Sequence, residues 1–74
     1  MDIKIIKQKK EMWGKKLIQL EKELEQIMYK KGEAARDGDL SENAAYKQAI
    51  EDADTWRARI EDVKKILANL EGSK

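Results

Sequence analysis

The sequence contains no cysteine, no histidine, no proline and no phenylalanine. The lack of cysteine excludes disulfides, and the lack of both cysteine and histidine removes the ligands of the usual structural zinc sites. No apolar run is long enough for a signal peptide or a membrane span, since the longest near the start is Ile5-Ile6. We therefore expect a reduced, soluble, cytoplasmic protein that has no membrane partner.

Charge is abundant instead, at 42% of the 74 residues, together with leucine, isoleucine and alanine. This composition is typical of long exposed helices or a coiled coil. A chain of this length forms one small domain, residues 1–74, which cannot enclose a large core. The net charge of +1 conceals a polarised distribution. Residues 1–16 hold six lysines against two acids, whereas residues 33–42 hold four acids against Arg36 alone.

Apolar residues recur along the chain with spacings that alternate between three and four. In the first half they fall at Ile6, Trp13, Leu17, Leu20, Leu24, Ile27 and Ala34, with Lys10 and Lys31 at the intervening positions. In the second half they fall at Tyr46, Ala49, Ala53, Trp56, Ile60, Val63, Leu67 and Leu70. This heptad spacing predicts two coiled-coil helices, and we call these positions the seam.

Lysine and glycine residues interrupt the apolar pattern of the first predicted helix. Lys31 occupies a seam position and is expected to extend its ammonium outward. Gly14 and Gly32 lie inside the helix, where each is expected to mark a bend or, for Gly14, a loosely attached lead-in.

The two halves of the seam match when the chain folds back on itself. The residue numbers of facing positions then add to a constant, as for Leu20 with Ile60, and the centre of symmetry is Leu40. Flanking positions predict pairs of opposite charge at Glu23–Arg59, Lys30–Asp52, Glu21–Arg57 and Lys7–Glu71. The sequence thus predicts an all-α fold, a long antiparallel two-helix coiled-coil hairpin with its turn near residues 37–41.

Carboxylates gather at this predicted turn. Gly38 suits a helix end, Asp39 has the chemistry of an N-cap for the second helix, and Glu42 follows at the spacing of a capping box. Mg²⁺ prefers oxygen ligands and is commonly held by one or two protein carboxylates with further ligands from elsewhere. Asp39 and Glu42 are therefore candidates to complete a Mg²⁺ site shared with a partner. The alternative is that they only cap the helix, an effect of about 1 kcal/mol.

The stretch Gly38-Asp39-Leu40-Ser41-Glu42-Asn43-Ala44-Ala45-Tyr46, preceded by Ala34-Ala35-Arg36, closely resembles the tip motif of the bacterial Gre transcription elongation factors (GreA and GreB). The resemblance implies an N-terminal coiled-coil domain that enters the secondary channel of RNA polymerase. There its tip would help the polymerase hold a second Mg²⁺ and cleave the 3′ end of backtracked RNA.

The resemblance also assigns roles to residues. Asp39 and Glu42 match the functional acidic pair, which assists the polymerase-bound Mg²⁺. Tip-shaping roles fall to Gly38, Leu40, Ser41, Asn43 and Tyr46. Apart from the resemblance, the cations on the approaches to the tip are candidates to contact RNA or acidic residues of the polymerase, with a solvated surface as the alternative: Lys30, Lys31, Arg36 and Lys47. The chain would not be an enzyme, because the catalytic core belongs to the polymerase, and it would bind no cofactor in isolation.

The chain departs from the family pattern in two ways. The C-terminal globular domain of Gre factors is expected to be absent from residues 1–74, and Ala45 stands where the family usually has glutamate. Two alternative functions follow. The chain could occupy the polymerase channel as a regulator or inhibitor without stimulating cleavage. It could also be a structural module that self-associates weakly through apolar residues off the seam, which are Ile3, Ile5, Met12, Ile18 and Ile66.

Overall fold

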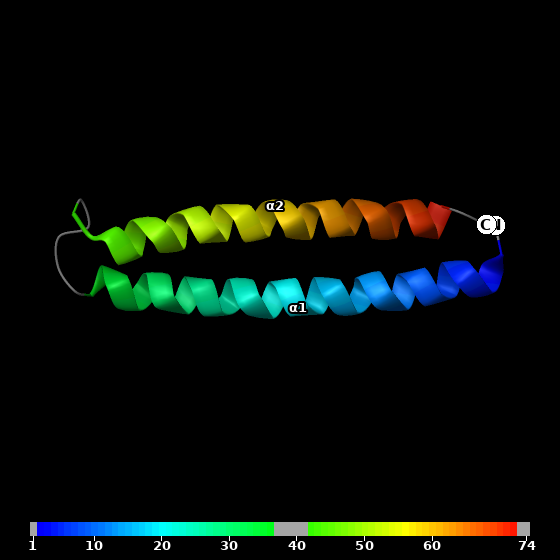
Figure 1. Cartoon of the computed structure of the whole chain (residues 1–74), viewed down its shortest axis with the longest axis horizontal. Helices are drawn as coiled ribbons and strands as arrows, with labels where there is room; N and C mark the ends of the chain where they lie inside the picture. The colour runs from blue at the N-terminus through cyan, green and yellow to red at the C-terminus, as the bar shows by residue number, and fades with distance from the viewer. Residues whose placement is uncertain (1, 37–41, 73–74) are drawn as a thin grey trace.

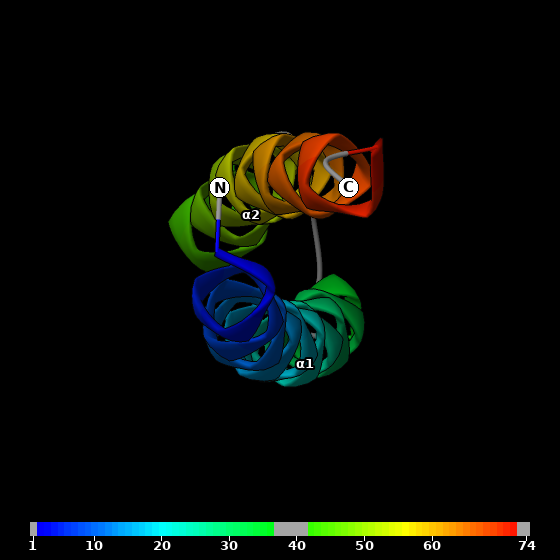
Figure 2. The same cartoon turned by 90° about the vertical axis from the view of Figure 1, so that its right-hand side faces the viewer.

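The computed structural model describes residues 2–36 and 42–72. They form two helices, α1 (Ile3–Ala35) and α2 (Ala44–Gly72), which run antiparallel and side by side along their whole length (Figure 1). The molecule is a rod whose backbone spans 55 × 15 × 11 Å. Seen along the rod, the two helices lie one above the other and are not strictly parallel (Figure 2). The prediction of an all-α helical hairpin is confirmed, while the turn near residues 37–41 lies outside the described residues.

Helix α1 is continuous from its cap to its last turn. Asp2 is the N-cap, because its side chain accepts a hydrogen bond from the Lys4 backbone N–H at 3.0 Å. The helix then passes through Gly14 and Gly32 without interruption. The expected loose lead-in before Gly14 is therefore wrong. In neither described helix is there an apolar stretch long enough to cross a membrane.

Gly32 offers a direct test of this continuous helix. No atom lies within 4 Å of the position that a Cβ would take at Gly32. Replacing Gly32 by alanine is expected to raise the free energy of unfolding by about 0.5–1 kcal/mol, because alanine loses less backbone entropy in a helix. Urea unfolding followed by far-ultraviolet circular dichroism should show a higher midpoint with an unchanged slope. A lower midpoint would show that the backbone at Gly32 is not helical.

The buried residues all lie on the predicted seam. They are Ile6, Leu20 and Ala34 on α1, and Ala49, Ala53, Ile60 and Val63 on α2. At mid-rod, Leu20, Ile60 and Val63 form the core cluster, and the partly buried residues packed against it are Trp13, Leu17, Leu24, Trp56 and Leu67. Towards the end where α1 stops and α2 begins, the buried seam residues are alanines. The apolar spacing therefore predicted both the faces that meet and their register.

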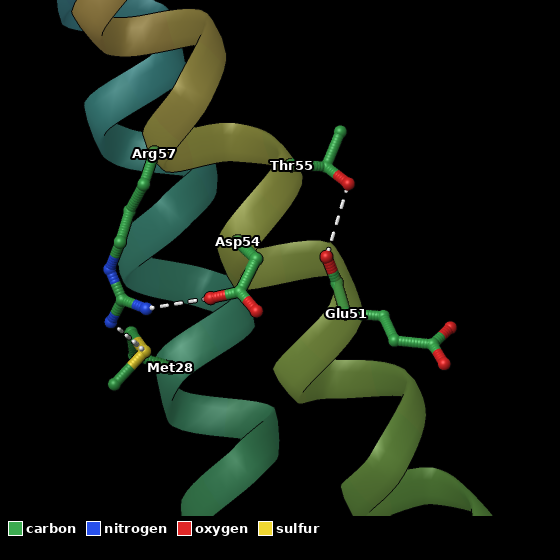
Figure 3. A network of polar contacts seen from close by, with 5 residues as sticks. All are labelled: Met28, Glu51, Asp54, Thr55 and Arg57. Atoms are coloured by element: carbon green, nitrogen blue, oxygen red, sulfur yellow. Dashed lines mark hydrogen bonds and ion pairs between the residues drawn. The ribbon is translucent and has the colours of Figure 1, made fainter.

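Contacts on the flanks differ from the predicted charge pairs. Glu71 pairs with Lys10 at 3.3 Å instead of Lys7. Arg57 reaches Asp54 on its own helix, and its second nitrogen lies 3.5 Å from the Met28 sulfur on α1 (Figure 3). Near this group, the Thr55 hydroxyl donates to the Glu51 carbonyl at 3.1 Å (Figure 3).

The remaining predicted pairs are replaced in the same way. Glu23 accepts a hydrogen bond from the Trp56 indole N–H at 3.3 Å, while the Arg59 guanidinium lies 4.6 Å from the Trp56 ring centroid. Asp52 accepts from Gln48, one turn before it on α2, at 2.9 Å. Exposed ion pairs contribute only about 0–1 kcal/mol, so a partner on the same helix or an aromatic ring competes easily with a facing charge. Packing of the seam, rather than charge, therefore sets the register.

Candidate functional site

The candidate site is at the end of the rod where α1 stops and α2 begins, and we call the described residues there, 33–36 and 42–46, the tip (Figure 1). Four of the predicted site residues lie outside the described residues: Gly38, Asp39, Leu40 and Ser41. Those that the structure places are Lys30, Lys31, Arg36, Glu42, Asn43, Tyr46 and Lys47.

The second helix is capped by Asn43. Its side-chain Oδ1 accepts a hydrogen bond from the Tyr46 backbone N–H at 3.0 Å, and its carbonyl accepts from the Lys47 N–H at 3.1 Å. This is the N-cap pattern, in which a side-chain oxygen satisfies an otherwise unpaired N–H of the first turn. The prediction that Asp39 and Glu42 form a capping box is wrong, because α2 begins only at Ala44. Asparagine and aspartate are equally good N-caps, so residue type alone does not decide between Asn43 and Asp39.

Glu42 consequently lies just outside the helix. It is exposed and directly precedes the cap residue. In a capping box, the acidic side chain sits three residues after the N-cap and folds back to its backbone N–H; here that position is held by Tyr46. The carboxylate of Glu42 is therefore not committed to capping α2.

Asn43 also contacts α1. Its side-chain Nδ2 donates a hydrogen bond of 2.6 Å to the carbonyl of Ala34, in the last turn of that helix. The last carbonyls of a helix have no partner within it, so this contact satisfies one of them. Sequence reasoning placed Asn43 among the tip-shaping residues but found neither bond. The sequence did contain a signal for the cap, because Asn43, a favoured N-cap residue, immediately precedes the helix-forming pair Ala44-Ala45.

Lys31 and Tyr46 form a second contact between the helices at the tip. The Lys31 ammonium lies 5.9 Å from the centroid of the Tyr46 ring, and both residues are half-buried. The expectation that Lys31 would point away from the seam is therefore corrected, because the ring face attracts the cation. Lys30, Arg36 and Lys47 are exposed and remain candidates to contact a partner.

Tyr29 and Glu33 interact one turn apart on the exposed side of α1. A hydrogen bond with the Glu33 carboxylate, together with its negative charge, raises the pKa of the Tyr29 phenol. Replacing Glu33 by glutamine is expected to lower the Tyr29 pKa, because a neutral amide no longer disfavours the phenolate. Tyrosinate absorbance can follow this titration in a Tyr46→Phe background, where Tyr29 is the only tyrosine left. A titration that Glu33→Gln leaves unmoved would contradict the contact.

The described acidic residues do not form a metal site by themselves. Among residues 2–36 and 42–72, no group of three or more potential histidine, cysteine, aspartate or glutamate ligands comes together. A carboxylate such as Glu42 can thus hold a metal ion only with donors from elsewhere, which is how Mg²⁺ is commonly bound.

Comparison with known proteins gives one match. A family model described as "Transcription elongation factor, N-terminal" matches residues 3–71, which is nearly the whole chain. No curated protein and no solved structure matches significantly. The match covers the whole of α1 and all of α2 except its last residue, Gly72.

Proposed function

Because the chain belongs to the GreA/GreB family of transcription elongation factor N-terminal domains, we propose that it acts on a transcribing RNA polymerase. In this proposal the rod enters the secondary channel of the enzyme, and its tip stimulates cleavage of backtracked RNA. The chain is not the nuclease itself, since the polymerase supplies the catalytic core. Its place of action is then the cytoplasm of a bacterial cell.

The shape of the molecule supports insertion into a narrow opening. The backbone spans 55 Å along the rod and only 15 and 11 Å across it, which is the width of two helices laid side by side before their side chains are added. Buried seam residues near the tip are Ala34, Ala49 and Ala53, whose small side chains let the helix backbones lie close together. The tip can therefore reach a site inside a partner that a globular domain could not enter.

The observation that carries the proposal is the exposure of Glu42 next to a helix that is already capped by Asn43. Its carboxylate is left to serve an external ligand, and Asp39, three residues earlier in the chain, would supply the second oxygen donor. Carboxylate oxygens are the donors that Mg²⁺ prefers, so this residue pair fits the ion. When Mg²⁺ is shared with the polymerase, it would stabilise the attacking and leaving oxygens of phosphodiester hydrolysis.

Three exposed cations around the tip have a supporting role in the proposal. Lys30, Arg36 and Lys47 are exposed and would contact RNA phosphates or acidic residues of the polymerase channel. Lys31 is not assigned this role, because its ammonium already lies over the Tyr46 ring.

The test is RNA shortening in stalled elongation complexes. Polymerase is halted in a backtracked position on RNA labelled at its 3′ end, and the purified chain is added with Mg²⁺. Release of short labelled 3′ fragments supports the proposal. Inhibited synthesis without RNA shortening would instead identify a channel-blocking regulator. Absence of polymerase binding, together with a mass that rises with concentration in sedimentation, would identify a self-associating structural module.

A further inference from the structure

The side-chain amide of Asn43 bonds to both helices at once. Oδ1 accepts from the Tyr46 N–H of α2 at 3.0 Å, and Nδ2 donates to the Ala34 carbonyl of α1 at 2.6 Å. A backbone N–H can only donate and a carbonyl can only accept, so only this orientation of the amide satisfies both. Asn43 is half-buried and Ala34 is buried, which limits competition from water.

We infer that Asn43 is a positioning residue, whose amide holds Glu42 in a fixed place relative to the rod. Its bond to Ala34 joins residues nine apart in the sequence and so ties together the two ends of the predicted turn. Glu42 is the neighbour of Asn43, and its Cα is held about 3.8 Å from that anchored residue by the peptide bond. The inference rests on the proposed function in one respect, the role of Glu42 as an oxygen donor.

A second contact joins the same turns of the two helices. Lys31 lies three residues before Ala34 on α1, and its ammonium is 5.9 Å from the ring centroid of Tyr46, the residue that Asn43 caps. The first turn of α2 is therefore held to α1 both through the Asn43 amide and through the Tyr46 ring. Glu42 is attached directly to this held turn.

Asparagine is needed for this role because it combines an acceptor with a donor. Aspartate and serine are equally good N-caps, since each offers an oxygen to the Tyr46 N–H. Aspartate, however, has no proton to donate to the Ala34 carbonyl, and the serine hydroxyl is too short to reach across. The variants Asn43→Asp and Asn43→Ser thus keep the cap and remove the link between the helices.

The test is nuclear magnetic resonance on the isolated chain. In the wild type, we expect a scalar coupling through the hydrogen bond between the Asn43 side-chain nitrogen and the Ala34 carbonyl carbon. In both variants, the backbone order parameter of Glu42 should fall from about 0.85 to below about 0.6, while that of Tyr46 stays high. Gln48→Glu is the matched control, because it makes the same amide-to-carboxylate change at a side chain that bonds to Asp52 on its own helix. Glu42 order parameters that are unchanged in both variants would overturn the inference.

A polymerase assay tests the consequence for cleavage. At a saturating concentration of each Asn43 variant, the polymerase should cleave the RNA about tenfold more slowly or worse than with the wild type, with an unchanged half-saturating concentration, because misplacing a reacting group by 1 Å can cost about 100-fold. Asn43→Ser adds no charge, so it separates positioning from the extra carboxylate of Asn43→Asp. Unchanged cleavage in both variants would overturn the functional role of the link. If the wild type itself stimulated no cleavage, the proposed function would fail, and the order parameters would still decide whether Asn43 positions Glu42.

Discussion

Replacing Asp39 by asparagine is expected to slow transcript cleavage stimulated by this chain by about 10- to 100-fold or more. Groups around a catalytic metal commonly cost that much when they are altered, and an amide is a weaker Mg²⁺ donor than a carboxylate. Glu42→Gln should give a loss of the same order. The measurement is the rate of 3′-fragment release from backtracked complexes at saturating concentrations of each variant.

A control variant separates the loss of a Mg²⁺ ligand from the loss of one negative charge elsewhere on the chain. Glu61→Gln removes the same charge from an exposed position on α2, roughly 28 Å from Glu42 at 1.5 Å per residue. It should leave cleavage unchanged. Raising the Mg²⁺ concentration should restore part of the rate in Asp39→Asn but not alter Glu61→Gln. Full activity in Asp39→Asn at low Mg²⁺ would remove the acidic pair from the mechanism.

The largest expected effect on stability comes from Leu20. This side chain is 2% exposed and belongs to the mid-rod core cluster with Ile60 and Val63. Leu20→Ala should lower the free energy of unfolding by about 2–5 kcal/mol, through lost burial and the cavity that remains. A chain of this size rarely has more than about 3–5 kcal/mol in total. We therefore expect the variant to be largely unfolded at room temperature, as measured by far-ultraviolet circular dichroism.

Ile18 provides the matched control for Leu20. It is two residues away on the same helix but 54% exposed, and it lies off the seam. Ile18→Ala should change the free energy of unfolding by no more than about 0.5 kcal/mol, as is usual for surface positions. Equal effects of the two substitutions would mean that the two helices do not pack through the seam in solution.

Much of the fold could be predicted from the sequence because apolar burial is periodic and strong. Leu20, Ile60 and Val63 recur at heptad spacing, and an antiparallel arrangement is the one that brings them together. A shift in register would expose several such residues at once. The burial of apolar side chains therefore decides the structure, and it is also the effect that the sequence pattern displays most clearly.

Polar contacts were harder to predict because many arrangements differ little in energy. Glu71 could pair with Lys7 or Lys10, and the structure has Lys10. The sequence predicted Asp39 as the N-cap, whereas the structure has Asn43, a residue type that caps equally well and that also bonds to Ala34 across the hairpin. The sequence thus indicated which residues belong to the candidate site. Only the structure revealed the cap that leaves Glu42 outside the helix.

Because the seam residues at the tip end are alanines, the stability of the hairpin and its width depend on different parts of the rod. Leu20 and its large neighbours provide most of the buried apolar contact at mid-rod, whereas the small side chains of Ala34, Ala49 and Ala53 let the two helix backbones lie close together near the tip. Substitutions at mid-rod should therefore change the stability of the hairpin without changing its width near the tip. A single bulky residue in place of Ala49 would push the two helices apart and widen the rod near the tip. Such a variant would enter only an opening wide enough to admit it, and would thus report the width of that opening.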